Sequence, residues 1–282
     1  MKTTIALWGF IFIALLLMPE TEEIPPYVPM PKQESLLPLK TKEDKDFNVY
    51  VHAAASEEYK EGYDEDGFPY RGYMSAKELS GAHVKSHDAK VRFQNRLYKL
   101  KKDFVDTMSL KALEVCKNTL VPPSILVAQS IIETAHGTSR LKHKANNFFG
   151  HTFKESDVKK KGIIGYMPAS DKDKHGKSSM HKFRIYKSAW WSLKHHVLLL
   201  ENNYAHRRKG KGPDREQWMA ALCGCNSDMN YVDAKKARYL YAGACAWAAK
   251  DGVTCRYVSE LRFIIRLYKL DKLDTKWKST KI

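Results

Sequence analysis

The stretch VPPSILVAQSIIETAHG, residues 121–137, constrains the fold of this 282-residue chain more than any other segment. Pro122 and Pro123 favour a helix start, because the first turn of a helix has no use for their missing N–H groups. Gly137 can end the helix in a left-handed turn. Between these points, apolar residues recur at helical spacing and predict a buried helix: Ile125, Leu126, Ala128, Ile132 and Ala135.

Glu133 is the one carboxylate of this predicted helix. A carboxyl group on the last turn of a buried helix loses solvation and meets the negative end of the helix dipole. Both effects raise the pKa of a carboxyl group, as a general acid requires. The alternative is an exposed helix-end Glu with no special role, and spacing by itself favours that alternative.

Two motifs in this region resemble the bacterial glucosaminidase family of peptidoglycan hydrolases, including its flagellar-type and Bax-like branches. They are AQSIIETAHGTSRL, residues 128–141, and ANNFFG, residues 145–150. In that family a helix carries the catalytic Glu, a Gly-x-Ser turn follows, and an Asn-x-Phe-Phe-Gly element closes the site. The resemblance covers roughly residues 115–270. It implies that Glu133 is the catalytic acid and that Asn147 and Phe149 bind substrate.

The second catalytic group has two open interpretations. Glycosidases of this kind often use a second carboxylate, and Asp171 precedes a segment, KFRIYKS, that resembles the family's Phe-Arg-x-Tyr-x-Ser. Alternatively, the N-acetyl group of the substrate attacks its own anomeric carbon and a tyrosine orients it. Trp247 stands where the family usually has that tyrosine, so Tyr257 becomes the candidate. Trp247 itself, and Tyr204 in an Asn-x-Tyr match, are expected to bind substrate.

The pattern along the chain predicts a mainly α protein with a small β lobe, an α+β fold that is lysozyme-like by this resemblance. Alternating and β-branched residues place the lobe between residues 146 and 186. Residues 88–275 are expected to form the catalytic domain, followed by a polar tail at 276–282. Helices are expected in these segments: 87–119, 139–144, 188–203, 215–223, 232–247 and 257–270.

The N-terminal segment indicates export. Lys2 precedes an apolar run, residues 5–18, and three glutamates follow it. Residues 1–18 are therefore predicted to be a signal peptide or a membrane anchor, with the protein in the periplasm or cell envelope and residues 5–18 able to hold it at the membrane. Residues 19–87 are rich in proline and acidic residues and are predicted to be a linker.

Charge is unevenly distributed between this segment and the rest. Residues 1–70 hold 13 Asp and Glu against 6 Lys and Arg, a net charge of −7. Because the whole chain has a net charge of +16, residues 71–282 carry +23. A domain this basic favours a polyanionic partner. Export argues against nucleic acid and leaves the teichoic-acid or peptide-carboxylate charge of a cell wall. The resemblance to the glucosaminidase family implies that peptidoglycan glycan strands are the partner.

The five cysteines indicate whether the protein lies in an oxidising compartment, where disulfides form. Cys116 is expected to be a buried thiol. The other four allow two disulfides in three possible pairings, with a zinc site as a rival whose spacing is unusual. The histidines have no metal-binding spacing, so no metal and no cofactor are expected. The disulfide candidates are Cys223, Cys225, Cys245 and Cys255.

Three functions remain open from the sequence. The first is an exported endo-β-N-acetylglucosaminidase that cuts β-1,4 glycan bonds with Glu133 as general acid. The second is a lytic transglycosylase, in which the same Glu acts as acid and then base. The third is a non-catalytic protein that binds the cell wall.

Overall fold

The computed structural model describes residues 62–172, 178–205, 214–223 and 256–279. Within these residues helices predominate and two strands form one small antiparallel sheet, as predicted. The helical elements are α3 (Ala76–Leu79), α4 (His87–Cys116), α5 (Pro123–Thr134), α6 (Arg140–Ala145), the 3₁₀ helix η1 (Glu155–Lys159), α7 (Ala189–Tyr204), α8 (Arg215–Cys223), α10 (Arg256–Leu267) and α11 (Asp271–Ser279).

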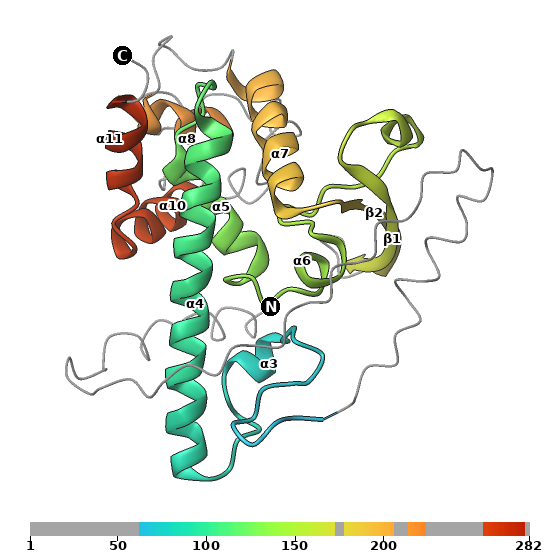
Figure 1. The fold of residues 1–282 in the computed structure, drawn as a ribbon, viewed down its shortest axis with the longest axis vertical. Coiled ribbons are helices and arrows are strands. Elements are labelled where there is room, and N and C mark those ends of the chain that lie inside the picture. The colour runs from blue at the N-terminus through green and yellow to red at the C-terminus, as the bar shows by residue number, and fades with distance from the viewer. Residues whose placement is uncertain (1–61, 173–177, 206–213, 224–255, 280–282) are drawn as a thin grey trace.

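Helix α5 lies at the centre of the helical part, surrounded by α4, α7, α8, α10 and α11 (Figure 1). Ten of its twelve residues are buried. Neighbouring helices cover most of its circumference, which is why apolar residues predominate in its sequence. The helix begins at Pro123, as predicted, but its last residue is Thr134 and its left-handed cap is Ala135, not Gly137. The left-handed turn therefore starts two residues earlier than the sequence suggested.

The β lobe is a hairpin of β1 (Ile163–Lys172) and β2 (Ser178–Tyr186). The register runs from Ile163 opposite Tyr186 to Lys172 opposite Ser178. Phe153, Ile163 and Tyr186 form a small core of their own, against which Tyr166 and Trp191 pack. Residues 148–153, which the sequence placed in the β lobe, form only one isolated bridge, between Thr152 and Phe183.

Part of the predicted linker is ordered. From Gly62 onward the chain folds against the first half of α4 through a second apolar cluster, formed by Phe68, Met74, Val84, Phe93 and Leu97. The Met74 N–H also donates to the Thr138 carbonyl at 2.9 Å, which ties this segment to the turn after α5. These apolar residues are widely spaced among glycines and acids, so periodicity does not reveal them.

The predicted polar tail also begins later than expected. Helix α11 extends to Ser279, and Trp277 is fully buried in the main core. The indole Nε1–H of Trp277 donates to the Cys116 carbonyl at 2.8 Å. Trp277 thus anchors the end of α11, one turn after Leu273, which also packs on the main core. Cys116 itself is a buried thiol, as predicted.

Within the described residues, no helix is both long and apolar enough to cross a membrane. The apolar run at 5–18 lies outside these residues, as do Cys225, Cys245 and Cys255 and the predicted helix at 232–247.

Candidate active site

Helix α5 brings one carboxylate to the surface. Glu133 is its only charged residue, and its side chain is exposed although almost all of the helix is buried. This exposure differs from the desolvated carboxyl expected from the sequence, because the last turn of α5 reaches the surface on the Glu133 side. A carboxyl group in this position is open to a ligand while its backbone is held by the core.

The turn that follows Glu133 has an unusual backbone. Ala135, His136 and Gly137 have φ values of 46°, 59° and 80°, all in the left-handed region. Left-handed residues other than glycine cost about 1–2 kcal/mol each, so surrounding contacts must hold them. The Gly137 N–H donates to the Thr134 hydroxyl at 2.7 Å and the His136 N–H to the Ile131 carbonyl at 3.1 Å.

Gly137 is needed here for a second reason. A Cβ atom at this position would lie 2.3 Å from the ring of Phe104 on α4. The absence of a side chain therefore lets α4 approach the turn closely. Together with the left-handed backbone, this packing fixes where Glu133 lies relative to α4.

Tyr257, on the first turn of α10, lies within electrostatic reach of Glu133. Its side chain is buried, and burial raises the pKa of Tyr257 well above its usual value. The charge of Glu133 raises this pKa further, while a hydrogen bond from Gln129, 3.0 Å long, opposes the rise. Tertiary packing thus brings together two residues, Glu133 and Tyr257, that are 124 positions apart in the sequence.

Glu260 and Gln129 join this group, and the sequence interpretation missed both. The charge of Glu260 also raises the pKa of Tyr257. Glu260 follows Tyr257 by three positions and Gln129 precedes Glu133 by four, so each pair shares one face of its helix. Helical spacing from the two candidate residues is the signal that points to them.

Asn147 and Phe149, predicted to bind substrate, are buried beneath the site. The Asn147 amide nitrogen donates to the carbonyls of His151 and Arg184, at 2.9 and 3.0 Å, and its oxygen accepts from the His151 N–H at 3.0 Å. Phe149 stacks on His196 with ring centroids 3.7 Å apart. Both residues hold the loop against the lobe and α7, and substrate contact by either stays a prediction.

Tyr204, the last residue of α7, is buried in the main core and lies near enough to Tyr257 to raise the pKa of that tyrosine. Asp171 lies in β1 opposite Ser179, and its side chain is outside the described part of the chain. Trp247 is also outside it. The roles assigned to these three residues stay predictions.

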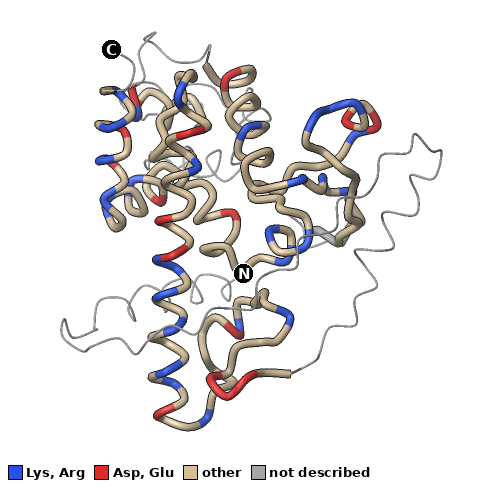
Figure 2. The backbone as a smooth tube through the Cα atoms, viewed as in Figure 1, with Lys and Arg blue, Asp and Glu red and all other residues tan. Residues whose placement is uncertain are grey.

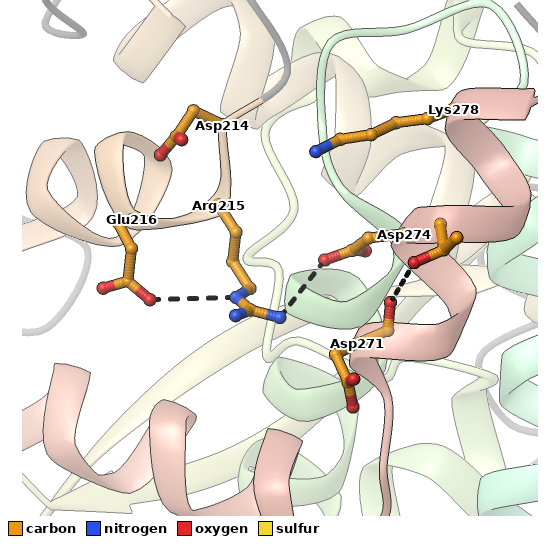
Figure 3. A pocket seen from close by; sticks show the side chains of 7 residues that line it. Asp214, Arg215, Glu216, Asp271, Asp274 and Lys278 are labelled. Carbon is orange, nitrogen blue, oxygen red and sulfur yellow. Dashed lines mark hydrogen bonds and ion pairs between the residues drawn. The ribbon is translucent and has the colours of Figure 1, made fainter.

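A pocket with many charged residues lies at the other end of α5. Its lining comes from α11, α8 and Asp214, which precedes α8, and Figure 3 shows Arg215 between Glu216 and Asp274. Asp274 accepts hydrogen bonds from the Ser124 N–H and hydroxyl, at 3.0 and 2.7 Å. Nine residues of helix, about 14 Å, separate Ser124 from Glu133. Asp274 of this pocket therefore caps the start of α5, and the pocket is separate from the Glu133 site.

A comparison of the sequence with family models decides the family. The glucosaminidase model, described as mannosyl-glycoprotein endo-beta-N-acetylglucosaminidase, matches residues 109–270, more than half of the chain. The chain belongs to the glucosaminidase family. The matched region contains Glu133, the left-handed turn, the whole β lobe and Tyr257.

Individual relatives of this glucosaminidase are more distant. Exo-glucosaminidase LytG of Bacillus subtilis is 30% identical over 118 residues, which are 39% of this chain and 38% of LytG. The chain therefore matches less than two-fifths of that curated relative. Among solved structures, the catalytic domain of the autolysin Auto from Listeria monocytogenes is 21% identical, with a TM-score of 0.44, covering 68% of this chain and 99% of that one. The glycoside hydrolase domain of FlgJ from Salmonella typhimurium is 22% identical, with a TM-score of 0.41, covering 64% and 96%.

Proposed function

We propose that this glucosaminidase hydrolyses the β-1,4 glycan bonds of peptidoglycan as an endo-β-N-acetylglucosaminidase, with Glu133 as the general acid. One observation carries the proposal: a buried helix with a single charged residue presents that carboxyl at the surface, beside the hydroxyl-bearing Tyr257. Hydrolysis of a glycoside needs a proton delivered to the leaving oxygen, and a rigidly held, accessible carboxyl group is suited to deliver it.

Tyr257 is the group that we assign to the substrate's acetamido oxygen. In a substrate-assisted reaction this oxygen attacks the anomeric carbon, and a hydroxyl donor beside it holds the acetamido group in line. Tyr257 is suited to donate, because burial, the largest cause of its raised pKa, keeps its hydroxyl protonated also when Glu133 is the neutral acid. Asp171 remains the alternative, as a second carboxylate on the lobe.

The charge distribution supports a polyanionic partner. Lys and Arg recur along α4, α11 and the β lobe (Figure 2). We propose peptidoglycan glycan strands as that partner, and export to the periplasm or cell envelope as the route to it. The apolar run at residues 5–18 supports export, either as a cleaved signal or as a membrane anchor.

The test is digestion of purified sacculi with the protein and with Glu133→Gln, followed by mass spectrometry of the products. Wild type should release fragments with reducing-end N-acetylglucosamine, and the variant should lose activity by at least about 100-fold, as expected when a general acid is removed. Glu155→Gln is the matched control, because Glu155 is an exposed lobe residue whose only described partner is Lys182 at 3.3 Å. It should cleave like wild type.

Other outcomes identify the competing functions. Products with 1,6-anhydro-muramic ends would indicate a lytic transglycosylase, and binding without cleavage would indicate a wall-binding protein. The length of the early products distinguishes endo cleavage from exo cleavage, the mode in the name of LytG. Endo cleavage gives fragments of many lengths at once, whereas exo cleavage releases short products from the chain ends. Equal cleavage by wild type and Glu133→Gln would refute the assigned acid.

A further inference from the structure

A continuous chain of buried hydrogen bonds runs from the β lobe to Tyr257. The Tyr186 hydroxyl lies 2.7 Å from His151 Nδ1, and His151 Nε2 lies 3.0 Å from His196 Nδ1. His196 Nε2 lies 3.2 Å from the Gln129 oxygen, and Gln129 Nε2 lies 3.0 Å from the Tyr257 hydroxyl. All five side chains are buried. They come from β2, the loop before η1, α7, α5 and α10, so the chain crosses from the lobe to the helical core (Figure 1).

Arg184 determines the direction of this chain at the lobe end. Its guanidinium can only donate, and its Nη1 lies 3.3 Å from the Tyr186 hydroxyl oxygen. Arg184 is itself held by buried Asp157, through Nε at 2.7 Å. Among the described residues the Tyr186 hydroxyl has only Arg184 and His151 as partners. Because it accepts from Arg184, its own proton must go to His151 Nδ1, or a buried proton would have no acceptor.

The direction of this first hydrogen bond determines the direction of each one that follows. A neutral imidazole has one donor and one acceptor nitrogen, so His151 donates from Nε2 to His196 Nδ1. His196 in turn donates from Nε2 to the Gln129 oxygen, which leaves the Gln129 NH₂ group to donate to Tyr257. The Tyr257 oxygen accepts there, and its own proton is directed to another acceptor. Cooperative chains of this kind strengthen each bond.

Both histidines are neutral at ordinary pH, as this direction requires. Burial, and then the charge of Arg184, lower the pKa of His151 to about 3. Burial lowers the pKa of His196 well below its usual value, and His151 adds to the effect. An imidazolium at either position would donate from both nitrogens and would break the chain.

We propose that Tyr186, His151, His196 and Gln129 are positioning residues that hold Tyr257 as a hydrogen-bond donor toward the bound sugar. This inference rests on the proposed function for its catalytic consequence, whereas the direction of the chain stands on geometry alone. It assigns a role to the lobe's Phe-Arg-x-Tyr-x-Ser segment: Arg184 and Tyr186 of that segment orient a hydroxyl on α10.

The first test measures the tautomers directly. Long-range ¹H–¹⁵N spectra of histidine-labelled protein, assigned with His151→Gln and His196→Gln, should show both rings neutral and protonated at Nε2 from pH 5 to 8. A ring protonated at Nδ1, or a titration near pH 6.5, would overturn the proposal. This readout is independent of activity. Correct tautomers in a protein that cleaves no glycan would support the chain and refute the proposed function.

The second test is kinetic. Tyr186→Phe removes one donor without changing the ring, so it should lower kcat about 3- to 10-fold with little change in KM, as expected for one lost hydrogen bond. In a Tyr257→Phe background the same change should cost nothing more, because its effect passes through the Tyr257 hydroxyl. An equal loss in both backgrounds would show a merely structural role and overturn the proposal. Tyr166→Phe on the facing strand is the matched control and should leave kcat unchanged.

Discussion

Gly137→Ala is expected to destabilise this protein for two separable reasons. The first is the backbone: φ at Gly137 is 80°, where an alanine costs about 1–2 kcal/mol. The second is packing: the new Cβ would lie 2.3 and 2.6 Å from two ring atoms of Phe104, and overpacking of this kind costs about 1–3 kcal/mol. Alanine also reduces the entropy of the unfolded chain, which offsets about 0.5–1 kcal/mol. The net loss in the free energy of unfolding should be about 1–4.5 kcal/mol.

Gly150→Ala provides the matched control. Gly150 has a similar φ of 62°, but a Cβ there would meet nothing within 4 Å. Gly150→Ala should therefore carry only the backbone cost less the entropy offset, a loss in the free energy of unfolding of about 0–1.5 kcal/mol. Urea unfolding followed by circular dichroism gives both values, provided that the dependence of free energy on urea is the same for each variant.

Phe104→Ala isolates the packing contribution. In that background the ring is gone, and Gly137→Ala should cost no more than Gly150→Ala does in wild type. If Gly137→Ala is as mild as Gly150→Ala in the intact protein, the close approach of Phe104 does not constrain the turn. The reasoning on how the position of Glu133 is fixed would then be refuted.

Three further predictions concern stability. Asp274→Ala should cost about 1–3 kcal/mol in urea unfolding, because the start of α5 loses its cap at Ser124; an unchanged midpoint would contradict this role. Trp277→Ala should lower the free energy of unfolding by about 3–5 kcal/mol in the same measurement, since it leaves a cavity at a buried site. A loss no larger than that of a substitution at an exposed residue would exclude the end of α11 from the core. Burial by itself would raise the pKa of Glu78, but hydrogen bonds from Ser75, Tyr63 and Arg71 lower it to about 2. Its contribution is therefore complete above its unfolded pKa of about 4.5 and is lost as pH falls toward 2, so the stability gap between wild type and Glu78→Gln should close over that range.

Much of the fold could be predicted from local sequence. Helix α5 was predictable because two prolines, an apolar run and a lone Glu coincide in twelve residues, and α8 matches its predicted bounds of 215–223. The hairpin was predictable from β-branched residues flanked by turn residues. These features depend on backbone preference and on apolar periodicity, which are properties of short segments.

The ends of the described region were harder to predict. Trp277 follows Leu270 and Leu273 at helical spacing, and its indole bonds the Cys116 carbonyl, which is 161 positions away. The ordered segment from Gly62 likewise depends on contacts with α4. Such short apolar patterns do not show which part of the chain they pack against, so only the tertiary structure reveals the contact.

The sequence by itself determined that this chain is a mainly helical member of the glucosaminidase family with Glu133 as its candidate acid, because one helix and its neighbouring motifs carry that information locally. Only the tertiary structure decided that Glu133 is exposed, that Tyr257 lies within reach of its charge, and that Gln129, His196, His151 and Tyr186 connect Tyr257 to the lobe. Hydrogen bonds between side chains on five separate segments depend on how those segments pack, and no spacing along the chain encodes them.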